Sequence, residues 1–431
     1  MNINNWSIAT CMLLFSMNSF AQDKKQLRLE DVMEMAYHNS SDAKVIDSKV
    51  KARQLEYEAS KDGYLPDAKL SGTYLLLNSP TVDLKIPMEG GGKMPDITMN
   101  QLFLGQLSVN MPIYTGGKIK NNIKSAEDSW KSSELQAVAD KQNLAIQGMH
   151  IYIALYKAQQ TTQLIAENIK KSEQQVVDFK AMEENGVIAR NDLLKAQLQL
   201  SNYKVSHQEA VKNVKVLSYQ LSVLLGLDED TNYDAINLAA NPSAVILSTN
   251  PNDRYEIKSL EAQKDVAQDQ LNVTKSAYYP TVVASGGYAA IQMHNLVTVT
   301  NAANVGVGVS YDIGALYKNK KKINIAKQHI EEVNQNLTQA QDKIKTQIQS
   351  SQQEVLLAKE KQKLYQEACA QANENYRIVQ DKYNNGVADT DDLLEADVQQ
   401  LQSKINLAIG DATIVEKYYD LLLASGQLQL K

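Results

Sequence analysis

The residues whose type and spacing could do chemistry are two carboxylates, Asp392 and Glu395, near the start of a long helical pattern. A spacing of three places both side chains on one face of a helix. If several copies of the chain surrounded one axis, these carboxylates would form a ring that favours cations over anions. The other interpretation is that they are solvated charges at a helix start, where the helix dipole stabilises them. The residues alone leave both open.

The sequence contains no pattern typical of catalysis or of metal binding. The five histidines are too dispersed in sequence to form a metal-ligand spacing, and neither an HExxH nor a GxSxG motif occurs. Gly116, Gly117 and Lys118 lie between an expected strand and helix, as a phosphate-binding loop would. However, Pro112 replaces the first glycine of that motif, and Ile119 replaces its Ser or Thr. We therefore predict no catalytic residues, no cofactor, no metal site and no enzymatic activity.

The composition indicates an extended protein with much surface. The chain has 431 residues and 43% hydrophobic side chains, with only four Phe and two Trp, which is lean for a compact globule of this size. Long polar stretches without Pro or Gly suit extended helices whose outer faces meet water. The net charge is -6 and no basic stripe dominates, which argues against a nucleic-acid partner.

The first 21 residues are typical of a secretory signal. They contain no charged side chain, have an apolar centre and end in Ser19, Phe20 and Ala21. The weak point is the start of this segment, which lacks Lys and Arg. After cleavage Cys369 is the one remaining cysteine, which excludes an intramolecular disulfide. Later stretches fall short of the roughly 20 apolar residues of a spanning helix.

The chain repeats one pattern at an offset of 200 residues, which indicates two quasi-equivalent halves. The matching residues include Asn185, Gly186, Val187, Asp192, Leu193 and Leu194, which recur as Asn385, Gly386, Val387, Asp392, Leu393 and Leu394. We predict a first repeat over 22–227, an equatorial linker over 228–253 and a second repeat over 254–431. Near the start of each repeat the offset becomes 214, so the first half carries 14 extra residues, which we read as a long exposed loop over 79–101.

Each half contains two segments with the period of two that is typical of strands. Their ranges are about 67–78, 102–114, 281–292 and 302–314. Strands of about ten residues, apolar on one face and small or polar on the other, fit a transmembrane β-barrel with a wet lumen. A soluble antiparallel sheet with one buried face is the alternative. Because even the smallest barrels need about eight strands, the membrane interpretation requires several chains to share one barrel.

Two stretches of about 67 residues, 118–184 and 318–384, are predicted to be single helices about 100 Å long. Within the second, apolar residues step by three and four, as in a heptad seam. Shorter helices over about 42–64, 190–226, 254–278 and 390–426 would stack in pairs end to end along the long ones. The Asn-Gly pairs at 185–186 and 385–386 are expected to supply left-handed residues that end the long helices.

In this order, the elements resemble the TolC family of outer-membrane efflux and export channels over nearly all of the mature chain. The most specific piece is the segment from Pro112 to Gly117, which is similar to the family's exit from the second strand. Arg254, Tyr255 and Glu256 resemble the helix before the third strand, and Asn385, Gly386 and Val387 resemble a periplasmic tip turn.

The resemblance implies a mainly α fold with a transmembrane β-barrel. Three identical chains would share one 12-stranded barrel, continued by an α-helical barrel through the periplasm. It implies location in the outer membrane, contact with outer-membrane lipid, and passive export. It further implies a periplasmic adaptor (membrane fusion) protein and an inner-membrane pump of RND or ABC type. The family's pump selects the cargo, so the sequence of the channel does not name it.

Site residues follow from the same resemblance. The tip turns would be Asn185, Gly186 and Val187 in the first half and Asn385, Gly386 and Val387 in the second. The acidic ring of the constriction would fall on Asp392 and Glu395.

The chain departs from the family near the second tip turn. Where the family places an arginine that latches neighbouring helices, this chain has Ala388. Asp192 would then need another partner, such as Lys195 or a group on a neighbouring chain, and Asp389 and Asp391 could share the acidic role.

Two further interpretations stay open. One is a secreted or periplasmic coiled-coil scaffold or adhesin, in which the strands form soluble caps. The other concerns basic residues where the strands meet the long helices, which could contact anionic head groups or form a solvated face. These residues are Lys118, Lys120, Lys124, Lys318, Lys320, Lys321 and Lys322.

Overall fold

The computed structural model describes residues 25–78, 100–228, 233–235, 250–294 and 297–430. The expected signal peptide, the 79–99 part of the inserted loop, and 229–232 and 236–249 of the linker lie outside these residues. The described helices are α1 (Leu29–Asn39), α2 (Ser41–Lys61), α3 (Lys118–Glu184), α4 (Arg190–Leu225), α5 (Tyr255–Lys275), α6 (Ala315–Asn384) and α7 (Thr390–Ala424). The strands are β1 (Lys25–Leu27), β2 (Asp67–Leu76), β3 (Gln101–Tyr114), β4 (Tyr233–Ala235), β5 (Thr281–Met293) and β6 (Val297–Ser310).

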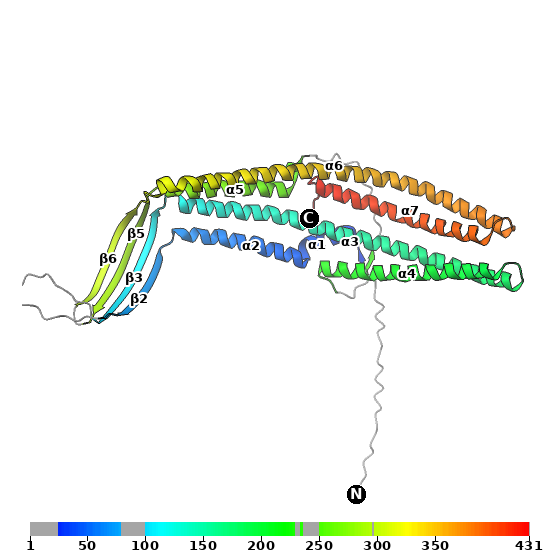
Figure 1. Cartoon of the computed structure of the whole chain (residues 1–431), viewed down its shortest axis with the longest axis horizontal. Coiled ribbons are helices and arrows are strands. Elements are labelled where there is room, and N and C mark those ends of the chain that lie inside the picture. The colour runs from blue at the N-terminus through cyan, green and yellow to red at the C-terminus, as the bar shows by residue number, and fades with distance from the viewer. Residues whose placement is uncertain (1–24, 79–99, 229–232, 236–249, 295–296, 431) are drawn as a thin grey trace, which may run out of the picture.

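The molecule is elongated, with a four-stranded sheet at one end and the two helical hairpins, α3–α4 and α6–α7, ending at the other (Figure 1). The long helices α3 and α6 run nearly the whole length of the helical part. As expected, shorter helices lie in pairs along them: α2 and α4 along α3, and α5 and α7 along α6 (Figure 1). Among the described residues, none of these helices combines the length and apolar content that crossing a membrane requires.

The helices pack through narrow seams, so buried apolar residues form separate small clusters. The largest cluster lies at the middle of the molecule, where Met149, Tyr152 and Leu155 of α3 are fully buried. A second cluster lies near the tips, where Phe179 of α3 packs with Leu193 of α4 and Leu393 of α7. The helix α3 has the bounds that the sequence predicted, whereas α6 begins three residues earlier, at Ala315.

The turns at the two tips share one geometry. Gly186 and Gly386 adopt left-handed φ angles of 73° and 71°. The backbone N–H of Val187 donates to the carbonyl of Met182 (2.8 Å), which is a Schellman helix end. Our expectation for the asparagines was wrong, because Asn185 and Asn385 have φ of -91° and -97°. Their side-chain amides instead donate to the carbonyls of Ala181 and Asp381, each at 2.7 Å.

The sheet is antiparallel with the order β2-β3-β5-β6, so among the described residues β2 and β6 are edges without a further partner strand. The fourth strand was placed too late by the sequence: it ends at Ser310, because Asp312 accepts a hydrogen bond from the backbone N–H of Ala315 (3.3 Å) at the start of α6. Tyr311 and Ile313 therefore lie beyond the strand.

The register separates the side chains of the sheet into two faces. One face is apolar and exposed, and Val305 on it is 91% exposed. Its members include Leu70, Tyr74, Phe103, Leu107, Val109, Met111, Tyr288, Val305, Val307 and Val309. The opposite face is mostly polar or small and includes Ser71, Thr73, Gln106, Ser108, Asn110, Ser285 and Asn304, although Leu104, Val283 and Ile291 also lie on it.

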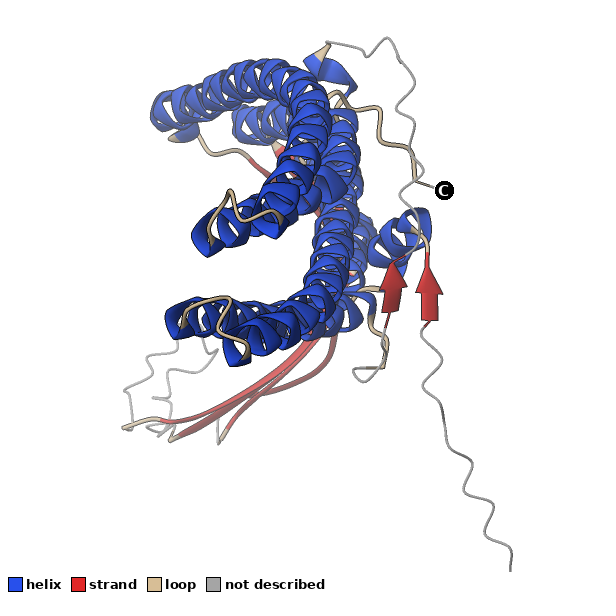
Figure 2. Cartoon of the chain, turned by 90° about the vertical axis from the view of Figure 1, so that its right-hand side faces the viewer, coloured by secondary structure: helices blue, strands red, loops and turns tan. Residues whose placement is uncertain are grey.

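A short parallel pairing of β1 with β4 lies at the middle of the molecule. The hydroxyl of Tyr152 on α3 donates to the carbonyl of Leu27 (2.7 Å), and the hydroxyls of Tyr233 and Ser222 lie 3.0 Å apart. Figure 2 shows these two strands beside the helices, on the convex side of the curved helical layer. The described part of the equatorial linker is thus fixed to the central core.

Candidate functional site at the helix tips

The predicted acidic residues lie on the first turns of α7, next to the second tip turn. The Asp392 and Glu395 side chains are both exposed. The backbone N–H of Asp392 donates to Asp389 Oδ1 (2.9 Å), so Asp389 caps the helix. Glu395 accepts a hydrogen bond from Gln399 Nε2 (3.0 Å). In the described chain neither carboxylate lies within 4 Å of a cationic side chain, so both keep their charge directed to solvent.

Lys195 joins the two hairpin tips. Its Nζ lies 2.7 Å from Asp391 Oδ2 on α7 and 3.9 Å from Asp192 Oδ1 on its own helix. The hydrogen bond to Asp391 raises the pKa of Lys195 above its usual value. The structure therefore brings together three of the four residues proposed as tip contacts, while Asp389 serves as a helix cap. In the repeat, Lys195 occupies the position of Glu395, so the two halves carry opposite charges there.

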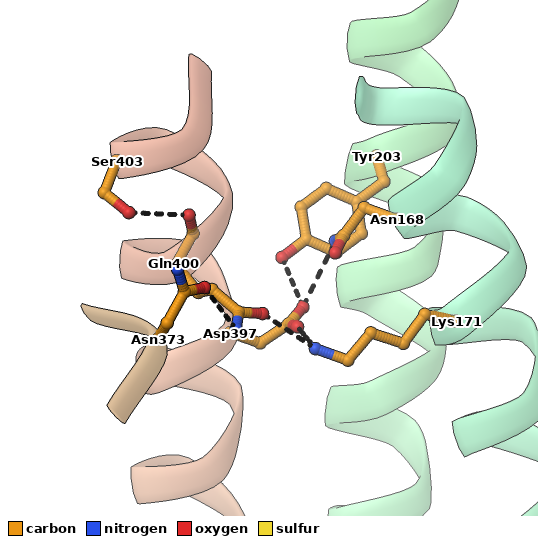
Figure 3. Close-up of polar contacts among 7 residues, drawn as sticks. All are labelled: Asn168, Lys171, Tyr203, Asn373, Asp397, Gln400 and Ser403. Atoms are coloured by element: carbon orange, nitrogen blue, oxygen red, sulfur yellow. Dashed lines mark hydrogen bonds and ion pairs between the residues drawn. The ribbon is translucent and has the colours of Figure 1, made fainter. Parts of the chain in front are cut away.

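A buried carboxylate that the sequence analysis did not single out lies one turn beyond. Asp397 of α7 is 2% exposed. Its Oδ1 accepts from Lys171 Nζ of α3 (2.6 Å), and its Oδ2 accepts from the hydroxyl of Tyr203 of α4 (2.8 Å) and from Asn168 Nδ2 of α3 (3.2 Å) (Figure 3). Every donor comes from the first hairpin and the acceptor from the second. The network thus fastens the hairpins to each other.

The surroundings of Asp397 complete the network. Lys171 Nζ also donates to Gln400 Oε1 (3.2 Å) and lies 3.4 Å from the centre of the Tyr376 ring. Gln400 donates in turn to Asn373 Oδ1 (3.0 Å) on α6 (Figure 3). Burial and the neighbouring Asp397 charge raise the pKa of Tyr203, so its hydroxyl stays protonated and remains a donor.

This network breaks the internal repeat, which is the signal that could have revealed it. The repeat equivalent of Asp397 is Gln197, and the equivalent of Tyr203 is Ser403. The equivalent of Lys171 is Gln371. Positions at which two related halves differ in charge, within otherwise matching helices, mark contacts that only one pairing of the hairpins makes.

A second charged cluster lies at the middle of the molecule, although the sequence suggested no histidine grouping. His150 Nε2 of α3 lies 3.1 Å from Asp420 Oδ1, and its Nδ1 lies 3.6 Å from Glu416 Oε1, both on α7. Lys157 Nζ contacts Glu416 at 2.6 Å. Hydrogen bonds to Asp420 and Glu416 raise the pKa of His150 to about 9, and those from His150 and Lys157 lower the pKa of Glu416 to about 2.

The ligand types of this cluster could hold a metal ion, since one atom of each of His150, Glu416 and Asp420 lies within 4.8 Å of the others. The geometry fits a protonated imidazole better, because each ring nitrogen faces its own carboxylate. A metal ion on one nitrogen would leave the other carboxylate beside the far nitrogen. Histidine spacing within the sequence could not show the cluster, because its members come from two helices about 270 residues apart.

Comparison with known proteins agrees with this architecture. The sequence pattern of the outer membrane efflux protein family matches residues 32–227 and 249–427. The outer membrane efflux protein BepC of Brucella suis is 21% identical to this chain, over 98% of this chain and 90% of BepC.

Solved structures show the same fold at low sequence identity. The CmeC outer membrane channel of Campylobacter jejuni superposes with a TM-score of 0.77 at 16% identity, covering 93% of this chain and 86% of CmeC. The outer membrane protein VceC of Vibrio cholerae gives 0.76 at 15% identity, covering 92% and 96%. The family pattern covers both repeats, and the solved channels share the sheet and the helices. The chain therefore belongs to the outer membrane efflux protein family and is an efflux channel of the outer membrane with a helical tunnel in the periplasm.

Proposed function

We propose that three copies of this chain form one 12-stranded barrel and one helical tunnel. The tunnel would serve as a passive exit duct that a periplasmic adaptor couples to an inner-membrane pump of RND or ABC type. The observation that carries the proposal is the sheet: it has an exposed apolar face, a polar face and two unpaired edges. Four strands cannot enclose a lumen. Antiparallel pairing of β6 with β2 of the next copy would close the barrel and satisfy both edges.

In this assembly the polar face of the sheet lines the lumen and the apolar face meets lipid, as in other outer-membrane barrels. Export would then require no catalysis by this chain, and the family is one of channels rather than of enzymes. The cargo would be set by the pump.

The narrowest part of the duct would lie at the helix tips, with Asp392 and Glu395 forming an acidic ring. Their exposure and their lack of a cationic partner within the described chain support this role, because the charges stay available to ions. Lys195, paired with Asp391, and the Asp397 network would hold the second hairpin against the first in the closed duct.

The test is single-channel conductance and ion selectivity of the detergent-extracted oligomer in a planar bilayer. We expect a small cation-selective conductance that loses selectivity in the double variant Asp392→Asn with Glu395→Gln, because the ring charge is removed. The control is Glu30→Gln with Asp31→Asn on α1, which removes the same charge far from the tips and should keep the wild-type selectivity.

Unchanged ion selectivity in the tip variant would show that the constriction lies elsewhere in the duct. Extraction without detergent, together with the absence of any conductance, would contradict the duct itself and favour the coiled-coil scaffold.

A further inference from the structure

A cavity lies where the sheet meets the helices, at the end of the molecule opposite to the tips. Its volume is about 350 Å³, and both polar and apolar side chains line it. Two lysines line it from the N-terminal parts of different helices, Lys118 of α3 and Lys322 of α6. Hydroxyl and amide groups form part of the wall, among them those of Thr115, Thr281, Ser310 and Asn319.

Positive side chains outnumber negative ones in the cavity lining, with Lys118 and Lys322 against Asp312. Neither Lys118 nor Lys322 lies within 4 Å of a carboxylate among the described residues, although Asp312 also lines the cavity. Asp312 is engaged by the backbone N–H of Ala315 (3.3 Å). The N-terminal dipole of α3, which has no acidic residue in its first turn, adds to the two ammonium groups, whereas the Asp312 carboxylate offsets the dipole of α6. An anion in the cavity would meet two ammonium groups and one carboxylate.

The sheet register indicates which side the cavity faces. Thr281 and Ser310 are direct partners of β5 and β6, one residue out of phase with the apolar pair Val282 and Val309. They therefore lie on the polar face of the sheet. Past the strand end, Ile313, Leu316 and Tyr317 are also exposed. The cavity thus opens away from the lipid side.

We propose that this cavity binds anionic groups of the phosphate type, and that three copies of it form a basic collar inside the duct just below the barrel. The lumenal location rests on the proposed trimer, whereas binding of the anion does not. The duct would then be acidic at its periplasmic tips and basic at the base of its exit. Anionic solutes on their way out would be retained or drawn forward at this level.

The binding test uses pyrophosphate as the probe and the purified oligomer in an uncharged detergent. Calorimetric titration should show saturable binding that weakens roughly tenfold or more in Lys118→Gln with Lys322→Gln, since charge-assisted hydrogen bonds are lost. The matched control is Lys320→Gln with Lys321→Gln, which removes two positive charges from neighbouring positions of α6 outside the cavity lining. Circular dichroism would verify that each variant is folded. Equal affinity in both variants, or no saturable binding by the wild type, overturns the proposal.

The location is tested by current measurements in a planar bilayer. Pyrophosphate added on the barrel side should reduce the open current of the wild type and of the control, but not that of the cavity variant. If the channel conducts and pyrophosphate binds without changing the current, the collar is not lumenal. Binding of short-chain phosphatidylglycerol in place of pyrophosphate would identify a lipid site and also contradict the proposal. A protein that binds pyrophosphate but never conducts would refute the proposed duct while keeping the anion site.

Discussion

At the scale of single residues, two charged contacts join the hairpins near their tips, one of them buried and the other exposed. Asp397 is buried and satisfied by three donors of the first hairpin, whereas Lys195 and Asp391 meet at the surface. A buried, hydrogen-bonded charge is costly to leave unpaired, and an exposed ion pair contributes little to stability. The two contacts should therefore respond differently to substitution.

Asp397→Asn should loosen the packing of α7 on the first hairpin, because Lys171 loses its counter-ion. The Lys171 side chain is 35% exposed and can reach water, so we expect the free energy of unfolding to fall by about 1–3 kcal/mol. Amide hydrogen exchange at the tip end of α7 should accelerate by roughly five- to hundredfold. Asp411→Asn, an exposed acid of the same helix, is the control. Exchange that stays at the wild-type rate would show that the network does not hold the hairpins.

Lys195→Gln should leave the stability nearly unchanged, because its ion pair is exposed. It should nevertheless lengthen the open time of single channels, since it removes the lysine that joins the two tips. The matched variant is Lys204→Gln, whose ion pair with Glu173 (2.8 Å) lies within the first hairpin. Equal gating in the two variants would show that the Lys195 contact plays no part in closure.

At the scale of elements, sequence periodicity predicted well the helix bounds that depend on residues close together in the chain. The bounds of α3 follow from 67 residues without proline, and both long helices end at the glycines that the repeat marked. The sequence placed β6 too late because alternation continues through Tyr311 and Ile313, where the cap at Asp312 has already turned the chain. The β1–β4 pairing was missed because three-residue strands more than 200 residues apart carry no periodic signal.

The candidate sites also divide into those that the sequence could locate and those that it could not. The tip turns and the charges beside them could be located from the repeat and the family resemblance, because they sit next to conspicuous glycines. The Asp397 network and the His150 cluster could not, because each is created by helices that meet only in the folded chain.

The His150 cluster makes the α3–α7 contact dependent on pH. The folded pKa of about 9 lies above the ordinary 6.5, so the His150 contribution is complete below pH 6.5 and is lost as the pH rises through 9. The pKa of Glu416 falls from 4.5 to about 2, so its contribution is present above pH 4.5 and is lost as the pH falls toward 2. His150→Gln should therefore lower the thermal midpoint most between pH 4.5 and 6.5, and hardly at pH 10.

Circular dichroism melting at pH 6 and pH 10 would measure this difference. His329→Gln serves as the control, because His329 is exposed and pairs with Glu332 within α6. A deficit in His150→Gln of equal size at both pH values would show that the charge on the imidazole is not what stabilises the contact.

At the scale of the whole molecule, the sheet decides where the protein can reside. Its apolar face is exposed in the single chain, and the helices bury little of it. Lipid and neighbouring copies are the partners that this face and the two open edges require.

Val307→Lys should therefore hinder insertion, because a lysine on the lipid face costs about 2–4 kcal/mol at the bilayer midplane and less toward the interfaces. Gly306→Lys is the matched control: it adds the same charge on the adjacent residue, which faces the polar side and has open space around it. We expect much less heat-resistant oligomer in the outer-membrane fraction for Val307→Lys, and near wild-type amounts for Gly306→Lys. If both variants assembled equally, the assignment of the two faces would be wrong.

The unpaired edges at β2 and β6 also have a genetic consequence. A barrel that closes only when every subunit supplies its edges incorporates a defective subunit as readily as a sound one, provided that those edges are intact. In a cell that makes wild-type and tip-defective chains in equal amounts, roughly one trimer in eight would be free of the mutant. Alleles altered at the tips should then be dominant-negative, whereas alleles that destroy an edge strand should be recessive, because their products are excluded from assembly.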